Sequence, residues 1–170
     1  MAIITTDKKL TCTDLEVAVA IGFNYRMNLI VPNISWGLNF KHEIDVLVLT
    51  PSNYAYEIEI KISASDLRRD FLKSHGHASN RLRRQYFCVT SKLEELALEL
   101  ITTRSPTWGL LVVPASRMMR IVRQAQPNKM ARPFTDAERQ HLYDLASMRT
   151  WTLKEIIANQ KRANLTGDHS

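Results

Sequence analysis

Two carboxylates and a lysine stand in a pattern that could bind a cation and act on a phosphate. Asp45 is followed fourteen residues later by Glu59, and Lys61 comes two residues after Glu59. Mg²⁺ in proteins is usually held by one or two carboxylates together with waters and substrate phosphates. A lysine beside such a site could position a water or stabilise charge that develops on a phosphate. These residues therefore form a candidate site for divalent-cation chemistry.

The stretch 42–62 predicts a β-hairpin that would bring these residues together. Residues 46–49 are a Val-Leu-Val-Leu run, and residues 57–62 alternate between charged side chains and isoleucine. This alternation sends Glu57, Glu59 and Lys61 to one face of a strand. Residues 51–53, Pro-Ser-Asn, supply turn chemistry between the strands. In register, the hairpin would let Asp45 and Glu59 converge; the alternative is a solvated strand face with a cross-strand charge pair.

A helix is predicted before the hairpin, over residues 13–23. Thr13 or Asp14 would cap this helix, and Glu16 would fall in its first turn. A role in a capping box or with the helix dipole would by itself explain Glu16. Closer to the hairpin, Glu43 is a candidate auxiliary carboxylate on the face of Asp45, and His42 is expected at the surface.

A strongly basic segment follows the second strand of the hairpin. Ser63 or Ser65 would cap a helix that runs to about residue 72. The candidate phosphate-binding side chains of this segment are Arg68, Arg69, Lys73, His75, His77, Arg81, Arg83 and Arg84. They begin directly after the candidate site, which favours contacts to a nucleic-acid backbone. The alternative is an exposed charged helix and loop.

Composition sets the class of protein. The chain has 170 residues, 45% hydrophobic and 24% charged, which is ordinary for one globular domain. The net charge of +6 favours a polyanionic partner. The two cysteines, Cys12 and Cys88, form no disulfide or zinc pattern, so the reducing cytoplasm is the expected compartment. No apolar run approaches a membrane span or a signal peptide, so no membrane partner is expected.

The remaining pattern predicts an α/β protein with a central mixed β-sheet and helices on both sides. Residues 86–90, 108–113 and 119–124 predict further strands, and residues 91–101 predict an amphipathic helix between the first two. A terminal helical region would follow Pro133. The expected organisation is one domain over residues 1–162 and a flexible tail over residues 163–170.

Asp45 with Glu59-Ile60-Lys61 resembles the D…(D/E)-x-K signature of the PD-(D/E)xK, or restriction-endonuclease-like, nuclease superfamily. Ile44 stands where the proline of the motif would be. Further segments follow in an order similar to that of MmcB-like DNA-repair proteins, a branch of this superfamily. Over residues 13–160 these segments are the E-x-K strand, S-x-x-D, K-x-H at Lys73 and His75, Tyr86-Phe87, W-G-L-L-V-V, R-P-F-T-x-x-E and L-A-S-x-R-x-W.

The resemblance implies a restriction-endonuclease-like fold and hydrolysis of DNA phosphodiester bonds. Asp45, Glu59, the Ile60 carbonyl and Glu16 would hold Mg²⁺ or Mn²⁺, and Lys61 would position the attacking water. The expected partner is DNA, structured or branched and read with little sequence preference, and the chain could act as a homodimer. Two alternatives stay open: an inactive nuclease-fold module that only binds nucleic acid, and a structural protein whose basic face binds an acidic protein.

Overall fold

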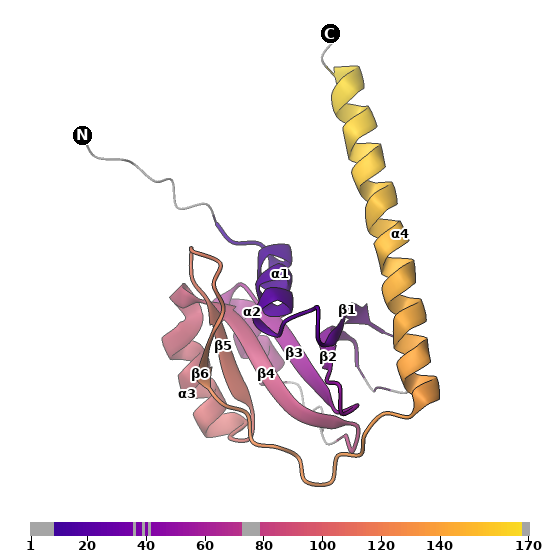
Figure 1. Cartoon of the computed structure of the whole chain (residues 1–170). Helices are drawn as coiled ribbons and strands as arrows, with labels where there is room; N and C mark the ends of the chain where they lie inside the picture. The colour runs from indigo at the N-terminus through magenta and orange to yellow at the C-terminus, as the bar shows by residue number, and fades with distance from the viewer. Residues whose placement is uncertain (1–8, 36, 39, 41, 73–78, 168–170) are drawn as a thin grey trace, which may run out of the picture.

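The computed structural model describes residues 9–35, 37–38, 40, 42–72 and 79–167. The chain contains both helices and strands, and Figure 1 shows the helices arranged around one sheet. The elements are α1 (Cys12–Gly22), β1 (Leu29–Ile34), β2 (Ile44–Leu49), β3 (Ala55–Lys61), α2 (Ala64–Asp70), β4 (Leu82–Thr90), η1 (Ser91–Leu93), α3 (Glu94–Arg104), β5 (Gly109–Val113), β6 (Arg120–Arg123) and α4 (Asp136–Gly167).

The six strands form one mixed sheet in the order β1-β2-β3-β4-β5-β6. Strands β1, β2 and β3 are antiparallel neighbours, β3, β4 and β5 run parallel, and β6 pairs antiparallel with β5. The predicted mixed α/β class is therefore confirmed. The predicted hairpin is also confirmed, since β2 pairs with β3 from Leu49 opposite Ala55. Asn53 takes the left-handed conformation in the turn, which Asn tolerates better than most residues.

Alternating side chains of the strands divide the core between the two faces of the sheet. One face packs against α1, with Val48 and Ile58 beside Leu15 of the helix. The opposite face carries two apolar clusters. Leu47 and Leu49 belong to the cluster that the first turns of α4 cover, and the other cluster lies under α2 and α3. The sheet is therefore covered by helices on both sides, as predicted.

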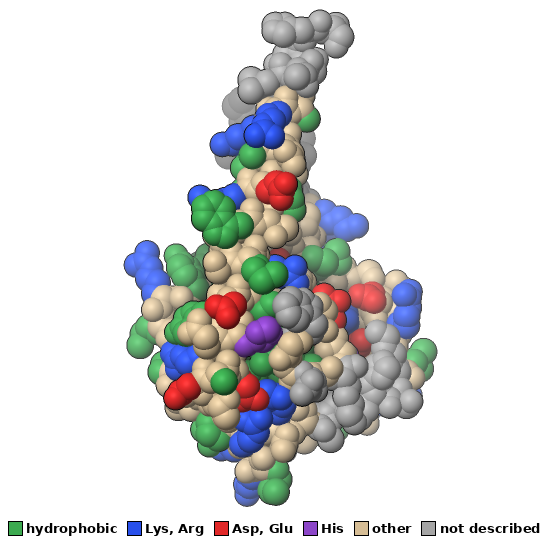
Figure 2. Space-filling view, turned by 90° about the vertical axis from the view of Figure 1, so that its right-hand side faces the viewer, with side chains coloured by type: hydrophobic (Ala, Val, Ile, Leu, Met, Phe, Trp, Pro, Cys, Tyr) green, Lys and Arg blue, Asp and Glu red, His purple; other side chains and the backbone are tan. Residues whose placement is uncertain are grey.

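The terminal helix α4 leaves the body of the protein. Its first turns pack through Leu142 and Leu145, and Figure 1 shows the rest of the helix extending away from the sheet. Figure 2 shows this projection with apolar and basic side chains on its surface. Trp151 of this helix is 68% exposed. The helix continues past the expected boundary at residue 162 and ends at Gly167. None of the helices in the described part of the chain is both long and apolar enough to cross a membrane.

Gly109 gives a test of the packing between β4 and β5. A Cβ at this position would lie 2.4 Å from the ring of Tyr86 and 2.6 Å from the backbone nitrogen of Ala125. Tyr86 is fully buried, so its ring cannot move aside without opening the core. We expect Gly109→Ala to lower the free energy of unfolding by about 2 kcal/mol or more, measured by urea denaturation.

Gly22→Ala is the matched control. A Cβ at Gly22 would meet the methyl end of the Met119 side chain at 2.4 Å, and a methionine side chain can rotate away. We expect this change to alter the stability by less than about 1 kcal/mol. Equal effects of the two substitutions would contradict the packing described for Gly109.

Candidate functional site

A row of charged side chains crosses one face of the sheet between its two apolar clusters. Glu57, Glu59 and Lys61 all come from β3 and are 0%, 6% and 7% exposed. The isoleucines between them, Ile58 and Ile60, point into the core under α1. The predicted alternation is therefore confirmed, but the charged face is buried instead of solvated.

Lys61 lies between two carboxylates. Its Nζ is 3.1 Å from Oε2 of Glu59 and 3.6 Å from Oδ1 of Asp70. Asp70 is the last residue of α2, whose N-cap is Ser63, one of the two predicted caps. Burial alone would lower the pKa of Lys61, but Glu59 and Asp70, helped by Asp45, raise it above its ordinary value. The side chain is therefore a cation at neutral pH, and it can orient a water or a phosphate but cannot serve as a base.

Asp45 lies in β2 where the pairing with β3 ends. The last paired residues are Val46 and Ile58, and continuing this register by one pair sets Asp45 opposite Glu59. In place of a ladder hydrogen bond, the Ile60 N–H donates to Oδ2 of Asp45 over 2.8 Å. Burial raises the pKa of Asp45, although the Ile60 N–H and Lys61 oppose the shift.

Glu59 is the most strongly perturbed carboxylate of the site. Burial, followed by the negative charge of Asp45, raises its pKa to about 7, against the opposing effect of Lys61. A carboxylate that loses this much hydration and faces another carboxylate gains stability from a nearby cation. The electrostatics of the hairpin therefore fit a cation-binding role for Glu59.

Glu16 approaches the same site from α1. The helix begins one residue earlier than predicted, and its N-cap is Thr11, which forms a capping box with Asp14. The expected cap at Thr13 or Asp14 is therefore wrong, and the capping role considered for Glu16 belongs to Asp14. Glu16 is half-buried, and its pKa is raised by burial and then by Asp45. It thus lies within the electrostatic reach of Asp45.

The hydrogen bond between the Ile60 N–H and Asp45 also fixes the direction of the Ile60 carbonyl. The N–H and C=O groups of one strand residue point to the same edge of the strand. Since the Ile60 N–H bonds to Asp45 on the β2 side, the Ile60 carbonyl lies on that side too. Backbone and carboxylate oxygens are the ligands that Mg²⁺ and Mn²⁺ accept, so this donor set fits either ion.

A second group of potential ligands was not predicted as a site. Among the described residues, three side chains of the ligating types His, Cys, Asp and Glu gather with ligand atoms within 4.8 Å of one another: His42, Glu57 and Glu59. Nε2 of His42 is bonded to Oε1 of Glu57. His42, expected at the surface, is partly buried there, with its side chain 21% exposed and turned toward Glu57. The alternation that places Glu57 beside Glu59 was the available signal, whereas the approach of His42 depends on tertiary structure.

The basic segment divides into three parts. Arg68 and Arg69 lie on α2 and are exposed, where they could contact a backbone phosphate. Lys73, His75 and His77 fall outside the described residues. Arg81 lies directly before β4, Arg83 and Arg84 lie in its first three residues, and all three are partly buried.

The start of β4 is at the end of the sheet opposite to Lys61. Leu82 pairs with Ala55, the first residue of β3, whereas Lys61 pairs with Val89. A strand that runs parallel to its predecessor begins at the same end, so the chain crosses the whole sheet before β4 starts. Arg83 and Arg84 donate to the carbonyls of Asn128 and Ala125. The expectation that Arg81, Arg83 and Arg84 follow the phosphate path is therefore corrected, because these arginines bond within the protein.

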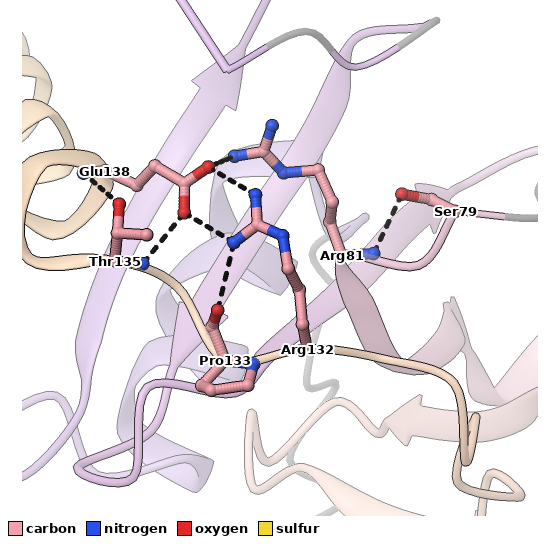
Figure 3. Close-up of polar contacts among 6 residues, drawn as sticks. All are labelled: Ser79, Arg81, Arg132, Pro133, Thr135 and Glu138. Carbon is pink, nitrogen blue, oxygen red and sulfur yellow. Dashed lines mark hydrogen bonds and ion pairs between the residues drawn. The ribbon is translucent and has the colours of Figure 1, made fainter.

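Arg81 helps to anchor α4, as Figure 3 shows. Its guanidinium lies over the neighbouring rings of Phe40 and Phe134, 5.5 and 5.2 Å from their centroids, and forms an ion pair with Oε1 of Glu138. Arg132 donates to both oxygens of Glu138, over 2.8 and 2.9 Å, and the Thr135 N–H donates to Oε2. The R-P-F-T-x-x-E motif is therefore a structural clamp at the start of α4.

This clamp predicts an acid-sensitive contribution to stability. Hydrogen bonding to Arg132 lowers the pKa of Glu138 from 4.5 to about 2, although partial burial opposes the shift. A depressed carboxyl pKa stabilises the fold above the unfolded value and loses that effect as pH falls through the folded one. We expect Glu138→Gln to cost about 2 kcal/mol at pH 7 and much less at pH 2.5, measured by urea denaturation.

Glu155→Gln is the matched control for this prediction, because Glu155 is exposed on the same helix. Glu155→Gln should leave the free energy of unfolding unchanged at both pH values. A loss at Glu138 that is independent of pH would show that the clamp acts through packing alone.

A pocket opens at the carboxyl ends of the three parallel strands. Its volume is about 400 Å³, and its lining includes Ile62 and Ser63 after β3, Thr90 at the end of β4 and Val113 at the end of β5. Lys9 and Lys92 also line it. Crevices at the carboxyl ends of parallel strands are common ligand sites in α/β proteins. Ile62, the residue after Lys61, lines the pocket, whereas the charged side chains of β3 are not among its lining residues.

Comparisons with known proteins inform the fold alone. No protein-family model matches the chain, and no curated protein matches it significantly. Among solved structures, the chain is similar to the SPO1766 protein of unknown function from Silicibacter pomeroyi, with a TM-score of 0.61 and 20% sequence identity. The match covers 91% of this chain and 95% of that one. It supports the same mixed α/β fold over nearly the whole chain.

Proposed function

We propose that this protein is a metal-dependent nuclease of the restriction-endonuclease-like superfamily that hydrolyses DNA phosphodiester bonds. The observation that carries the proposal is the group of half-buried Asp45 with buried Glu59 and Lys61 where the β2–β3 pairing ends. Mutually repelling carboxylates beside one lysine destabilise the fold unless something compensates their charge. A divalent cation and the phosphate that it binds would supply that compensation.

In this proposal, Asp45, Glu59 and the Ile60 carbonyl hold the cation, with Glu16 as an additional ligand from α1. The bound Mg²⁺ or Mn²⁺ would supply Lewis-acid stabilisation of charge on the phosphate and activation of water. The chain's own contribution is to desolvate the carboxylates and to fix their directions. Asp45 is fixed by the Ile60 N–H, and Glu59 by the Lys61 ammonium.

Lys61 has the role of positioning the attacking water. An ammonium group has three N–H donors, and the hydrogen bond to Glu59 uses one of them. Asp70 lies 3.6 Å from Nζ, at ion-pair distance. A further donor can bond a water or a phosphate oxygen next to the carboxylates. Since its pKa is raised, Lys61 would stay charged while negative charge develops on the phosphate.

The experiment for this proposal is a cleavage assay on a panel of labelled DNAs. Duplex, single-stranded, flap and four-way-junction substrates are incubated with the full chain and Mg²⁺, Mn²⁺ or EDTA. Cleavage that requires a divalent cation supports the proposal. Metal-independent binding without cleavage of any substrate would favour an inactive nucleic-acid-binding module. The cytoplasm, where Cys12 and Cys88 would stay thiols, is part of the proposal, and a homodimer stays a prediction that sedimentation can check.

The exposed arginines of α2 give a prediction for DNA binding. Arg68 and Arg69 are the described basic residues that follow β3 directly and are exposed. We expect the double change Arg68→Ala, Arg69→Ala to weaken binding equally on unrelated sequences of the same shape. The slope of log affinity against log salt should fall by about one for each phosphate that the variant no longer neutralises.

Lys129→Ala is the control, because Lys129 is exposed in the loop that bonds to the start of β4, far from Lys61. It should leave the salt slope unchanged. A double variant that loses affinity for one sequence alone would identify Arg68 and Arg69 as base readers, contrary to the prediction.

A further inference from the structure

We propose that His42, Glu57 and Glu59 form a second cation site, selective for a first-row transition metal such as Mn²⁺ over Mg²⁺. The three side chains have ligand atoms within 4.8 Å of one another. The site shares Glu59 with the site of the proposed function. Its existence does not require that the chain cleave DNA, so the two proposals can fail separately.

The spacing of the three ligand atoms is close to what an ion needs. With metal–ligand bonds of about 2.1 Å, neighbouring ligands of an octahedral ion lie about 3 Å apart and opposite ligands about 4.2 Å apart. The separations in this group reach at most 4.8 Å. Small side-chain rotations would therefore bring the three atoms onto one ion, without movement of the strand.

The surroundings of the group hold its carboxylates in fixed directions. The Gln85 amide donates to Oε2 of Glu57 over 2.6 Å, which leaves Oε1 turned toward His42. Lys61 donates to Oε2 of Glu59 over 3.1 Å. Hydrogen bonds of this kind to the second oxygen of a ligating carboxylate are a regular feature of metal sites. The register explains the first one, because Glu57 pairs with Gln85 on the parallel strand β4.

Burial and charge favour a cation at this position. Glu57 is fully buried and Glu59 is 6% exposed, so both carboxylates lack most of their hydration. The His42 imidazole carries at most one positive charge toward two carboxylates. A divalent ion would neutralise both and let the imidazole bind as a neutral ligand. His42 is 21% exposed, and it gives the ion a path from solvent.

The imidazole determines which ion the site prefers. Mg²⁺ takes oxygen ligands and retains several waters, whereas imidazole is a good ligand for first-row transition metals. The oxygen-only set of Asp45, Glu59 and Glu16 accepts either Mg²⁺ or Mn²⁺. The set that contains His42 discriminates between them. The protein would thus bind Mn²⁺ at a position where Mg²⁺ binds poorly.

The test is electron paramagnetic resonance of Mn²⁺ bound to the full chain. Pulsed spectra report the nitrogen of a coordinated imidazole as a ¹⁴N modulation. We expect this modulation in the wild-type protein and its loss in His42→Gln, together with at least about a tenfold weaker binding of Mn²⁺. Glu57→Gln should weaken Mn²⁺ binding to a similar extent, since it removes a ligand charge but keeps the shape. Circular dichroism verifies that both variants are folded.

The control replaces His75 and His77 together by glutamine, and it should keep the ¹⁴N modulation. Loss of the modulation in this control and not in His42→Gln would overturn the assignment. The assignment would also be overturned if the His42→Gln variant were less stable than the wild type but bound Mn²⁺ equally well. His42 and Glu57 would then form an ion pair without a role in metal binding. A protein that shows the modulation but cleaves no DNA would support this site and contradict the nuclease proposal. A protein that cleaves DNA with Mg²⁺ but shows no ¹⁴N modulation would support the nuclease proposal and contradict the second cation site.

Discussion

Glu59→Gln is expected to lower metal-dependent DNA cleavage by at least about a hundredfold, the usual scale for a lost catalytic electrostatic group. Glutamine keeps the size of the side chain and an oxygen that can accept from Lys61, but it removes the charge that binds the cation. The rate is measured under single-turnover conditions with saturating protein, so that weaker DNA binding does not enter. Glu99→Gln, an exposed change on α3, is the control and should cleave at the wild-type rate.

The same substitution should stabilise the metal-free protein. A carboxyl group whose folded pKa is raised stabilises the fold below its unfolded pKa and loses that effect as pH rises through the folded value. For Glu59 this window runs from 4.5 to about 7. At pH 8 without divalent cations, Glu59→Gln should therefore be more stable than the wild type by about 2 kcal/mol. A variant that loses both stability and cleavage would indicate a structural role for Glu59.

Lys61→Met is expected to reduce cleavage by a similar factor and also to destabilise the fold. Methionine preserves most of the apolar stem, so the change removes mainly the ammonium group. Glu59 and Asp70 then face each other without the cation between them, and a buried charge without its partner costs about 3 to 5 kcal/mol. Lower pH should restore part of the stability, because the carboxylates can then take up protons.

The control for this prediction is Lys154→Met on the exposed part of α4, which should change neither stability nor cleavage. Urea denaturation at pH 5 and pH 8 gives the stability, and the single-turnover assay gives the rate. Wild-type cleavage in Lys61→Met would rule out the positioning role. Equal destabilisation at both pH values would show that the repulsion between Glu59 and Asp70 is not its cause.

The parts of the fold that local pattern controls could be predicted from the sequence. The alternation of isoleucine with charged residues in β3 fixed its two faces, and the turn residues around Asn53 fixed the hairpin. The Ser63 cap of α2 was equally local. The cap of α1 was misplaced by two residues or more because Thr11, Thr13 and Asp14 all have capping side chains. Backbone conformation, which the sequence does not state, selects Thr11.

The parts that depend on contacts between distant segments could not be predicted. Asp70 reaches Lys61 because α2 folds back over β3, and His42 reaches Glu57 across the start of the hairpin. The spacing of these residues in the sequence predicts neither of the two contacts. Proximity in sequence misplaced Arg81, which lies twenty residues after Lys61 but at the opposite end of the sheet. A parallel crossover returns the chain to the end where the previous strand began.

The burial of the charged face also exceeded what the pattern could indicate. An alternating Glu-Ile-Glu-Ile-Lys strand is typical of a sheet with one solvated face. Here α2 and the start of α4 pack on the same face of the sheet, one on each side of the charged row, and Glu57 is fully buried. This cover raises the pKa of Glu59. The electrostatics of the charged row are therefore a product of tertiary structure acting on a locally encoded strand.

The measurement that tests the nuclease proposal most directly is single-turnover cleavage by wild type, Glu59→Gln and Lys61→Met, purified identically and assayed side by side. Each protein is incubated with the same junction, flap and duplex DNAs in Mg²⁺, in Mn²⁺ and in EDTA. The proposal predicts cleavage by the wild type with either ion, none in EDTA, and at least about a hundredfold slower cleavage by both variants. Cleavage that persists unchanged in both variants, or no cleavage by the wild type with either ion, would contradict it.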